Sequence, residues 1–515
     1  MSLVPRRVRH AGGRSGRALP SRAGACLVAC LAAAGACRSE TNDDGSGEQG
    51  LAAAPGAGAG TSSGSGGGSS GSAAVSGGVA GSANLGGSAG VAAGTPGSVA
   101  GSAQSAGAAG SAATSGGANS GGSGNMPSGG ASSGSGGAIG AGRYPFPQNV
   151  FSKHCTYPTN RNSEHARAAY ERWKRDIVTA DGANGFLRTR RPNSPGAEVN
   201  STVSEGIAYG MILAVVMGDQ PVFDGLWKYS QHWKNDNGLM SWYINAAGTQ
   251  ALGTGGATDS DEDIAWALIM ADRQWGGSGS LSETYLEAAK RQVDLIWRFE
   301  IDHSRDDFLL PGDSWGSNAL FNPSYFAPHQ YRLFGQVSGN VEGWNNVIDT
   351  GYEMLEKCLS PALGNEENGL APAWCKPDGT LANDQPGNYQ YDSARVPFRI
   401  GQDYCYNGEP RAAAYLAKVT RFFDAIGAAN IVDGYALNGT PQPDADSQPG
   451  SPQSAVFVGS VAVGAMHDPQ YKKLAEDAYA LVAPGDLLAR SIYYNMSWTA
   501  LSLLMLSGNL VDYPP

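Results

Sequence analysis

Carboxylates are the functional groups with which this sequence could do chemistry. The 515-residue chain has only 7 histidines, and its densest acidic run is residues 259–263. That run begins like a calcium-binding loop but lacks the glycine and the glutamate that such a loop needs further on, so a calcium site is excluded. Glu262 and Asp263 are predicted to cap the apolar helix that follows, since acids in a first turn complement the helix dipole. Asp259 is expected to precede that helix and is therefore a candidate for a functional role.

Four segments resemble the motifs of glycoside hydrolase family 8, in the order in which that family has them. They are Val203-Ser204-Glu205-Gly206 with Tyr209-Gly210-Met211; Ala257-Thr258-Asp259-Ser260-Asp261-Glu262-Asp263-Ile264-Ala265, continuing to Trp275; Asn322-Pro323-Ser324-Tyr325-Phe326-Ala327-Pro328; and Tyr391-Asp392 with Arg395 and Arg399. Ser260 departs from the alanine or glycine that the family usually has. The resemblance runs from about residue 145 to the C-terminus and is strongest to the bacterial endoglucanases.

The resemblance implies a fold, a mechanism and roles for three acids. The fold is an all-α (α/α)6 barrel of six inner and six outer helices, with a substrate cleft across one end. The mechanism is hydrolysis of a glycosidic bond with inversion, in which Glu205 matches the general acid and Asp392 the general base. Asp259 matches the aspartate that holds the sugar at the cleavage point and helps to distort its ring. No metal ion or organic cofactor is required.

Inversion makes opposite demands on the two carboxyl groups, which should lie about 6.5–9.5 Å apart with room for a water. The base must stay ionised, and Arg395 would favour the charged form of Asp392 if it folds back. The acid must hold its proton near neutral pH, which burial or the negative charge of Asp259 would promote. Glu205 stands near a predicted helix start, where the dipole lowers its pKa, so burial has to outweigh the dipole.

Each acid also has a purely structural interpretation. Judged without the resemblance, Glu205 is a capping acid beside Ser204, and Asp392 is half of a surface ion pair with Arg395. The four ordered motifs favour the functional interpretation for both acids and for Asp259.

Aromatic side chains in the predicted loops are candidates for binding sugar. The apolar faces of pyranose rings stack on tryptophan and tyrosine, while neighbouring polar groups bind the hydroxyls. Trp242 and Trp315 lie in loops and match sugar-stacking positions of the endoglucanases. The other substrate-binding candidates, near the cleavage point, are Tyr325, Tyr391, Arg395, Tyr493 and Tyr494.

Serial helices must position these groups. Apolar residues recur at three- and four-residue spacing in residues 164–178, which predicts an amphipathic helix. Comparable stretches recur at 204–217, 221–234, 261–275, 281–299, 340–358, 408–426, 453–466, 468–482 and 491–506. Long loops, at 236–258, 301–328 and 375–395, contain aromatics and are where function is expected on a helical scaffold.

The chain before residue 143 differs in kind from the rest. Six arginines and a short apolar run at 23–36 predict an export signal in residues 1–37, and Ala34-Gly35-Ala36-Cys37 resembles a lipoprotein cleavage box. Cys30 fits that box less well, and ordinary secretion is the alternative to a lipid anchor on Cys37. Residues 51–142 contain no charged or aromatic residue, so 38–142 is predicted to be a flexible linker with a mean reach of about 50 Å. Residues 143–515 form the predicted catalytic domain.

The net charge and the cysteines restrict the kinds of binding partner and the cellular compartment that fit this chain. The net charge of −11 becomes −17 once the six arginines before Cys37 are removed, which disfavours nucleic acid and suits a neutral polymer. Four cysteines remain in the domain, at 155, 358, 375 and 405, and could form two disulfides in an oxidising compartment, with three pairings open.

The sequence therefore predicts an exported, monomeric, inverting endo-β-1,4-glucanase that acts on cellulose-type or mixed-linkage glucan. A xylanase or chitosanase of the same family is the first alternative. A surface protein that binds glycans without cutting them is the second, and a structural envelope protein with no polysaccharide affinity is the third.

Overall fold

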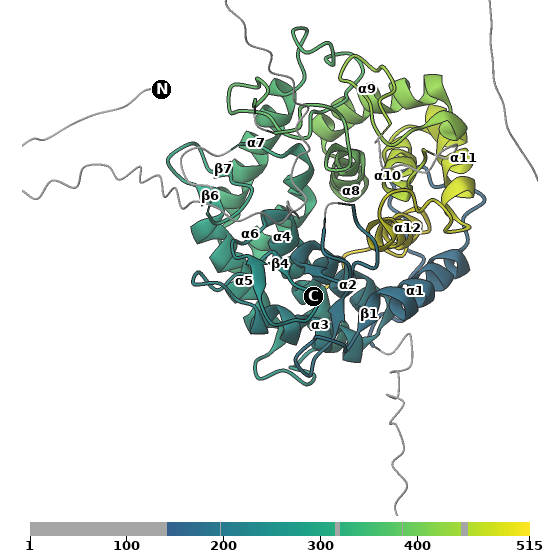
Figure 1. Cartoon of the computed structure of the whole chain (residues 1–515). Coiled ribbons are helices and arrows are strands. Elements are labelled where there is room, and N and C mark those ends of the chain that lie inside the picture. Colours follow the sequence, from purple (N-terminus) through teal and green to yellow (C-terminus); the bar gives the residue numbers. More distant parts are fainter. Residues whose placement is uncertain (1–141, 196, 315–319, 384, 444–451) are drawn as a thin grey trace, which may run out of the picture. The chain divides into compact units, whose positions relative to one another are not determined.

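Twelve α-helices alternate between an inner and an outer ring in the computed structural model, which describes residues 142–195, 197–314, 320–383, 385–443 and 452–515 (Figure 1). The inner ring comprises α2 (Ser204–Met217), α4 (Thr258–Trp275), α6 (Pro328–Ser338), α8 (Val396–Asn407), α10 (Ala455–Ala465) and α12 (Ile492–Leu506). The outer ring comprises α1 (Ser163–Ile177), α3 (Gln220–His232), α5 (Tyr285–Phe299), α7 (Val341–Lys357), α9 (Pro410–Ile426) and α11 (Lys472–Val482). Each inner helix contacts the next, and α12 closes the ring on α2. The predicted all-α (α/α)6 barrel is confirmed.

The two rings differ in sequence because they differ in burial. Helices α2 and α10 are apolar on every side and buried along almost their whole length, as expected for helices surrounded by protein. Helix α5 instead buries one face, with residues such as Ala288, Val293 and Ile296 packed inward. Its start is fixed by a capping box between Thr284 and Glu287.

Two inner helices, α6 and α8, fall outside the ten predicted stretches. Helix α8 buries Arg399, Gln402 and Asp403, so its inward face is polar and gives no apolar stripe. Helix α6 likewise buries His329 and Gln330. Because these helices bury polar residues that are paired inside the barrel, their sequences lack the apolar periodicity from which a helix is predicted.

Helix α4 begins earlier than predicted and its acids are not caps. It starts at Thr258, so Asp259 lies in the first turn and not before the helix. Glu262 and Asp263 are fully buried, and the capping interpretation of both is wrong. Glu262 accepts a hydrogen bond from Tyr331 (2.7 Å), and Arg399 binds Asp263 at both carboxylate oxygens. The barrel interior, not solvent, surrounds this helix start.

Short antiparallel strands occupy the connections between helices. The pairs are β1 (Val178–Thr179) with β2 (Arg188–Thr189), β3 (Thr202–Val203) with β4 (Tyr243–Ile244), β4 with β5 (Ala251–Gly253), and β6 (Ile301–Asp302) with β7 (Phe308–Leu309). Strand β3 runs directly into α2, and the backbone N–H of Ser204 donates to the carbonyl of Trp242 (3.0 Å). The β3–β4–β5 sheet therefore ties the start of α2 to the loop that carries Trp242.

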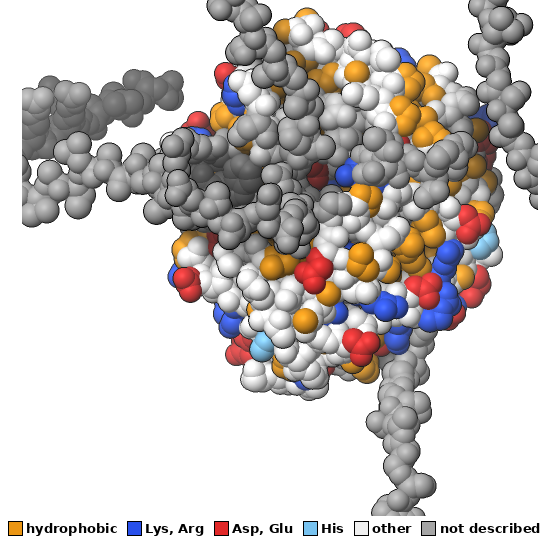
Figure 2. All heavy atoms as spheres, viewed as in Figure 1, with side chains coloured by type: hydrophobic (Ala, Val, Ile, Leu, Met, Phe, Trp, Pro, Cys, Tyr) orange, Lys and Arg blue, Asp and Glu red, His pale blue; other side chains and the backbone are white. Residues whose placement is uncertain are grey.

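Two disulfides crosslink the barrel domain, and an aromatic stack joins its two ends. The cysteines pair as Cys155–Cys405 and Cys358–Cys375, which selects one of the three pairings. Tyr144 stacks on Tyr513 with ring centroids 4.6 Å apart, and its hydroxyl donates to the carbonyl of Pro514 (3.0 Å). Within the described ranges, no helix has the length and apolarity to cross a bilayer. On the face shown in Figure 2, acidic and basic side chains are interspersed.

Candidate active site

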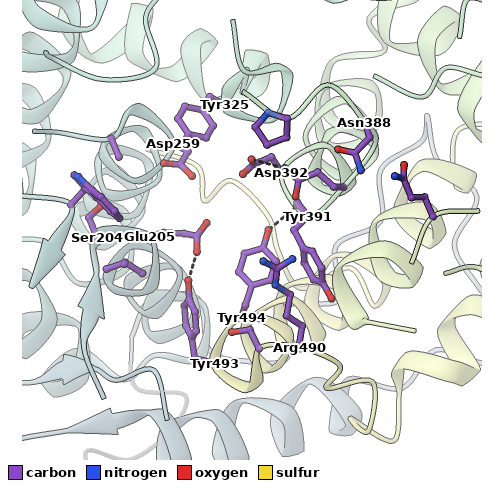
Figure 3. A pocket seen from close by; sticks show the side chains of 17 residues that line it. Ser204, Glu205, Asp259, Tyr325, Asn388, Tyr391, Asp392, Arg490, Tyr493 and Tyr494 are labelled. Atoms are coloured by element: carbon purple, nitrogen blue, oxygen red, sulfur yellow. Dashed lines mark hydrogen bonds between the residues drawn. The ribbon is translucent and has the colours of Figure 1, made fainter. Parts of the chain in front are cut away.

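A pocket of about 400 Å³ lies where the inner helices begin (Figure 3). The first turns of α2, α4 and α12 supply Glu205, Asp259 and Tyr493 to its wall. Tyr391 and Asp392 come from the segment that leads through a 3-10 turn, η3 (Ser393–Arg395), into α8. The sequence motifs thus meet at one end of the barrel.

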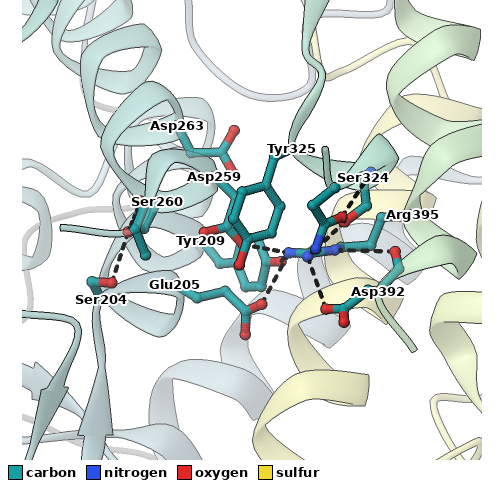
Figure 4. Close-up of polar contacts among 12 residues, drawn as sticks. Ser204, Glu205, Tyr209, Asp259, Ser260, Asp263, Ser324, Tyr325, Asp392 and Arg395 are labelled. Atoms are coloured by element: carbon teal, nitrogen blue, oxygen red, sulfur yellow. Dashed lines mark hydrogen bonds and ion pairs between the residues drawn. The ribbon is translucent and has the colours of Figure 1, made fainter. Parts of the chain in front are cut away.

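Arg395 lies beneath this pocket and joins its three acids (Figure 4). Its Nη1 donates to Asp259 Oδ2 (2.6 Å) and to Glu205 Oε2 (3.0 Å), and its Nη2 donates to Asp392 Oδ1 (3.3 Å). Nη2 also donates to Ser324 Oγ (2.7 Å). The predicted fold-back of Arg395 onto Asp392 is present. The side chain is 1% exposed and binds all three acids, so it holds them in place, and its role in binding substrate stays a prediction.

Glu205 has the environment that a proton donor requires. Its side chain is 20% exposed, and its Oε1 accepts a hydrogen bond from the hydroxyl of Tyr493. Burial raises the pKa of Glu205 to about 7, with Asp259 and Asp392 adding to the rise and Arg395 and Tyr493 opposing it. Burial therefore outweighs the dipole of α2, in whose first turn Glu205 lies.

Asp259 is more enclosed than Glu205. Its side chain is 5% exposed, and burial raises its pKa while Arg395, its nearest partner, lowers it. A buried carboxylate that binds a guanidinium group at one oxygen keeps capacity at the other, which suits a hydrogen bond to a sugar hydroxyl.

Asp392 is the most open of the three acids, with 32% of its side chain exposed. It accepts hydrogen bonds from Gln390 Nε2 (2.9 Å) and from Arg395. Since Glu205 and Asp392 bind the two ends of one guanidinium group, their bonded oxygens are no more than about 9 Å apart. That upper limit is compatible with the separation of about 6.5–9.5 Å that inversion requires.

Aromatic rings form much of the pocket wall. Trp242, Tyr325, Tyr391, Tyr493 and Tyr494 all line it, as the sequence predicts. Trp242 stacks on Tyr243 and lies directly over Gly253, where an added Cβ would come 2.2 Å from the indole Nε1. Trp315 lies outside the described residues, so its sugar-stacking role stays a prediction.

Comparison with known proteins assigns the family. A family model described as "Glycosyl hydrolases family 8" matches residues 149–508, which is more than half of the chain. The chain belongs to glycosyl hydrolase family 8.

Curated family 8 relatives and a solved structure agree with this assignment. The chain is 37% identical over 348 residues to "Endoglucanase A" of Acetivibrio thermocellus, which covers 67% of this chain and 69% of the relative. It is 38% identical over 335 residues to "Endoglucanase 2" of Ruminiclostridium josui, covering 63% and 68%. The β-1,3-1,4-glucanase structure from Paenibacillus sp. X4 superposes with a TM-score of 0.64 at 28% identity and covers 72% of this chain and 99% of that one. The protein is therefore a glycoside hydrolase.

Several pocket residues of this family 8 enzyme escape prediction from sequence. Asn388 and Gln390 line the pocket just before the Tyr391-Asp392 motif, and their closeness to it was a usable signal. Arg490 and Gln442 also line it but lie in segments with no recognisable pattern. Long connections place them, and only the fold reveals their position.

Proposed function

We propose that this family 8 enzyme is an inverting endo-β-1,4-glucanase, with Glu205 as general acid, Asp392 as general base and Asp259 holding the sugar at the cleavage point. The observation that carries the proposal is that Glu205 and Asp392 face one pocket from opposite ends of the Arg395 guanidinium. The raised pKa of Glu205 supports its role as the group that carries a proton at neutral pH.

In the proposed reaction, Glu205 transfers its proton to the glycosidic oxygen as the bond to the anomeric carbon breaks. Water attacks that carbon from the opposite face, and Asp392 accepts the proton that the water loses. The product has the opposite anomeric configuration, and proton exchange with solvent restores both carboxyl groups. Tyr493 orients the proton donor through its hydrogen bond to Glu205.

The choice of glucan rests on the relatives. Those with the higher identities are named endoglucanases, and the solved structure from Paenibacillus sp. X4 is named a β-1,3-1,4-glucanase. We therefore propose cellulose-type or mixed-linkage β-glucan as the substrate, cut within the chain. Xylan is the competing substrate, and a panel of polymers separates the two.

The test analyses the products of wild type and compares its activity with that of variants of the two carboxyl groups. Wild type should release reducing sugar from mixed-linkage glucan and carboxymethyl cellulose, with the inverted anomer visible by NMR at the first turnover. Glu205→Gln and Asp392→Asn should each lower kcat at least about 10³-fold, because each removes one proton-transfer group. Glu367→Gln is the matched control, since its side chain is 83% exposed. A retained anomer, or equal activity in Glu205→Gln and wild type, would contradict the mechanism.

We also propose that the protein is exported as a monomer and anchored by lipid at Cys37, with 38–142 as the linker and 143–515 as the catalytic domain. Two disulfides in the barrel support an oxidising compartment. Labelled palmitate should be incorporated into wild type and not into Cys37→Ser, while Cys30→Ser keeps the label. Light scattering of 143–515 gives its oligomeric state, and a cooperative thermal unfolding transition shows whether that segment folds alone.

A further inference from the structure

Gln390 supplies the shorter of the two hydrogen bonds that hold the proposed base. Its Nε2 donates to Asp392 Oδ2 (2.9 Å), while Arg395 Nη2 donates to Asp392 Oδ1 over 3.3 Å. An ionised carboxylate only accepts hydrogen bonds, so the amide turns its NH2 group toward Asp392. Each oxygen of the base thus has a donor, and Gln390 lines the pocket beside it.

Two donors on different oxygens determine the plane of the Asp392 carboxylate. This side chain is 32% exposed, and the terminal torsion of an aspartate has a broad minimum, so packing alone would leave the plane loosely fixed. A carboxylate oxygen accepts about two hydrogen bonds, which leaves capacity on both oxygens for a water. A fixed plane holds that water in one orientation, and a reacting group held in one orientation reacts faster.

The backbone of Gln390 is itself held in place. The N–H of Ala394 donates to the carbonyl of Gln390 (2.9 Å) at the turn that leads into α8. The preceding residue, the buried Tyr389, exchanges two backbone hydrogen bonds with Tyr435 (3.0 and 2.9 Å). Gln390 therefore presents its amide to Asp392 from a fixed point of the pocket wall, near the label of Asp392 in Figure 3.

A neutral donor suits this position because the site already shares one cation. The guanidinium group of Arg395 binds Glu205, Asp259 and Asp392 together. An amide N–H favours the ionised form of a carboxylate without adding a charge. A second cation beside Asp392 would also lower the pKa of Glu205 and so weaken the proposed acid as a proton carrier.

We propose that Gln390 is a positioning residue of the hydrolysis, which fixes the plane of the Asp392 carboxylate and keeps this base ionised to accept the proton of the attacking water. The inference rests on the proposed function, because it takes Asp392 as the general base. It adds a residue that none of the four sequence motifs contains.

Gln390→Met tests the inference because it removes the donor and keeps the length of the side chain. On soluble mixed-linkage glucan, kcat should fall about 10- to 100-fold and KM should change less than about threefold, since the base loses its orientation while the sugar contacts stay. The acidic limb of the pH profile of kcat/KM should move upward by about one pH unit, because a hydrogen bond to the ionised form is lost. Gln390→Glu has the same shape with a negative charge and should move that limb further. Gln336→Met, at an exposed position of α6, is the matched control and should behave like wild type.

The acidic limb reports residue 390 because the other charges around the base are the same in every variant. These groups are Glu205, Asp259 and Arg395 beside the base, and Asp433 and Arg490 around the ring of Tyr391. The alkaline limb near pH 7, which Glu205 sets, should stay in place in Gln390→Met. Movement of both limbs together would overturn the proposal, because it would show a general change of the pocket.

A double variant separates an action through Asp392 from any other role. Asp392→Asn removes the group that Gln390 orients, so adding Gln390→Met should lower kcat by less than about twofold further. Multiplicative losses would overturn the proposal, as would an effect of Gln390→Met confined to KM.

Binding shows whether the pocket stays folded. In a Glu205→Gln background, calorimetry should give cellohexaose affinities within about threefold of each other for Gln390 and Gln390→Met. Loss of this binding would overturn the proposal, since Gln390 would then act on the sugar or on the fold. Failure of the proposed function would look different: Asp392→Asn would keep wild-type activity, whatever residue stands at position 390.

Discussion

Arg395 Nη1 lies 3.0 Å from Glu205 Oε2, so the proton donor of the site is held by a buried cation. The same guanidinium group binds Asp259 and Asp392, and its removal would leave three acids facing one another. We expect Arg395→Met to lower kcat by about 10²–10³-fold and to destabilise the fold by about 3–5 kcal/mol. Because Arg395 lowers the pKa of Glu205, the alkaline limb of the pH profile should move upward in the residual activity. An unmoved limb would show that the two groups are not coupled.

The pH dependence of wild-type activity follows from the pKa of Glu205. Glu205 must be protonated to donate, and burial raises its pKa to about 7. Activity should therefore be present below neutral pH and fall as pH rises through about 7, with one proton lost. The pH profile of kcat/KM on a soluble glucan reports this value for the free enzyme. An alkaline limb near the ordinary glutamate value of about 4.3 would contradict the assignment of Glu205 as the acid.

Stability should respond to the same titration. Between about pH 4.3 and pH 7 the unfolded chain releases the Glu205 proton while the folded protein keeps it, so the free energy of unfolding falls as pH rises. The loss amounts to as much as about 3 kcal/mol and is complete above the folded pKa. Glu205→Gln does not titrate and should be about 1–3 kcal/mol more stable than wild type at pH 8, with a smaller difference at pH 5. Denaturant unfolding at both pH values measures the difference in free energy of unfolding between the variant and wild type, with Glu367→Gln as the control. If that difference were the same at pH 5 and pH 8, Glu205 would not titrate as described.

The close fit of Trp242 over Gly253 predicts a defect in binding. A methyl group at 253 would come 2.2 Å from the indole nitrogen, so Gly253→Ala should displace the ring. We expect KM to rise about 3- to 10-fold with a smaller effect on kcat, because a platform for sugar is lost while the acids stay in place. Tryptophan fluorescence should report the displacement in the free enzyme. Trp242→Ala should show the same KM and no further loss when combined with Gly253→Ala.

The ion pair of Arg399 with Asp263 should matter for folding. Both side chains are buried, and Arg399 Nη2 donates to Asp263 Oδ2 at 2.8 Å. Arg399→Met should cost about 3–5 kcal/mol because it strands a buried carboxylate. Asp263→Asn combined with Arg399→Met should recover part of that loss. Additive losses in the double variant would indicate that the two side chains act independently.

The outer helices and the start of α2 could be predicted because their signals are local. The amphipathic stripe of α1 and the apolar run of α2 are visible in the sequence, and Glu205 lies at the helix start where it was expected. Helix α8 could not be predicted, because its buried polar side chains have their partners far away in sequence. Arg399 binds Asp263, and Asp403 accepts a hydrogen bond from Arg332. Arg490 could not be found at all, because its place depends on how α12 meets the loop before α8.

The stack of Tyr144 on Tyr513 fixes the point at which the chain enters the catalytic barrel. Both residues lie against the last turns of α2 and α4, where Gln274 donates to the carbonyls of Tyr144 and Val215. The pocket lies against the first turns of the same helices, about 20 Å away along their axes. Gly142, the first residue of the described barrel, thus lies at the end opposite the pocket, and the point where the proposed linker would attach takes up none of the pocket mouth.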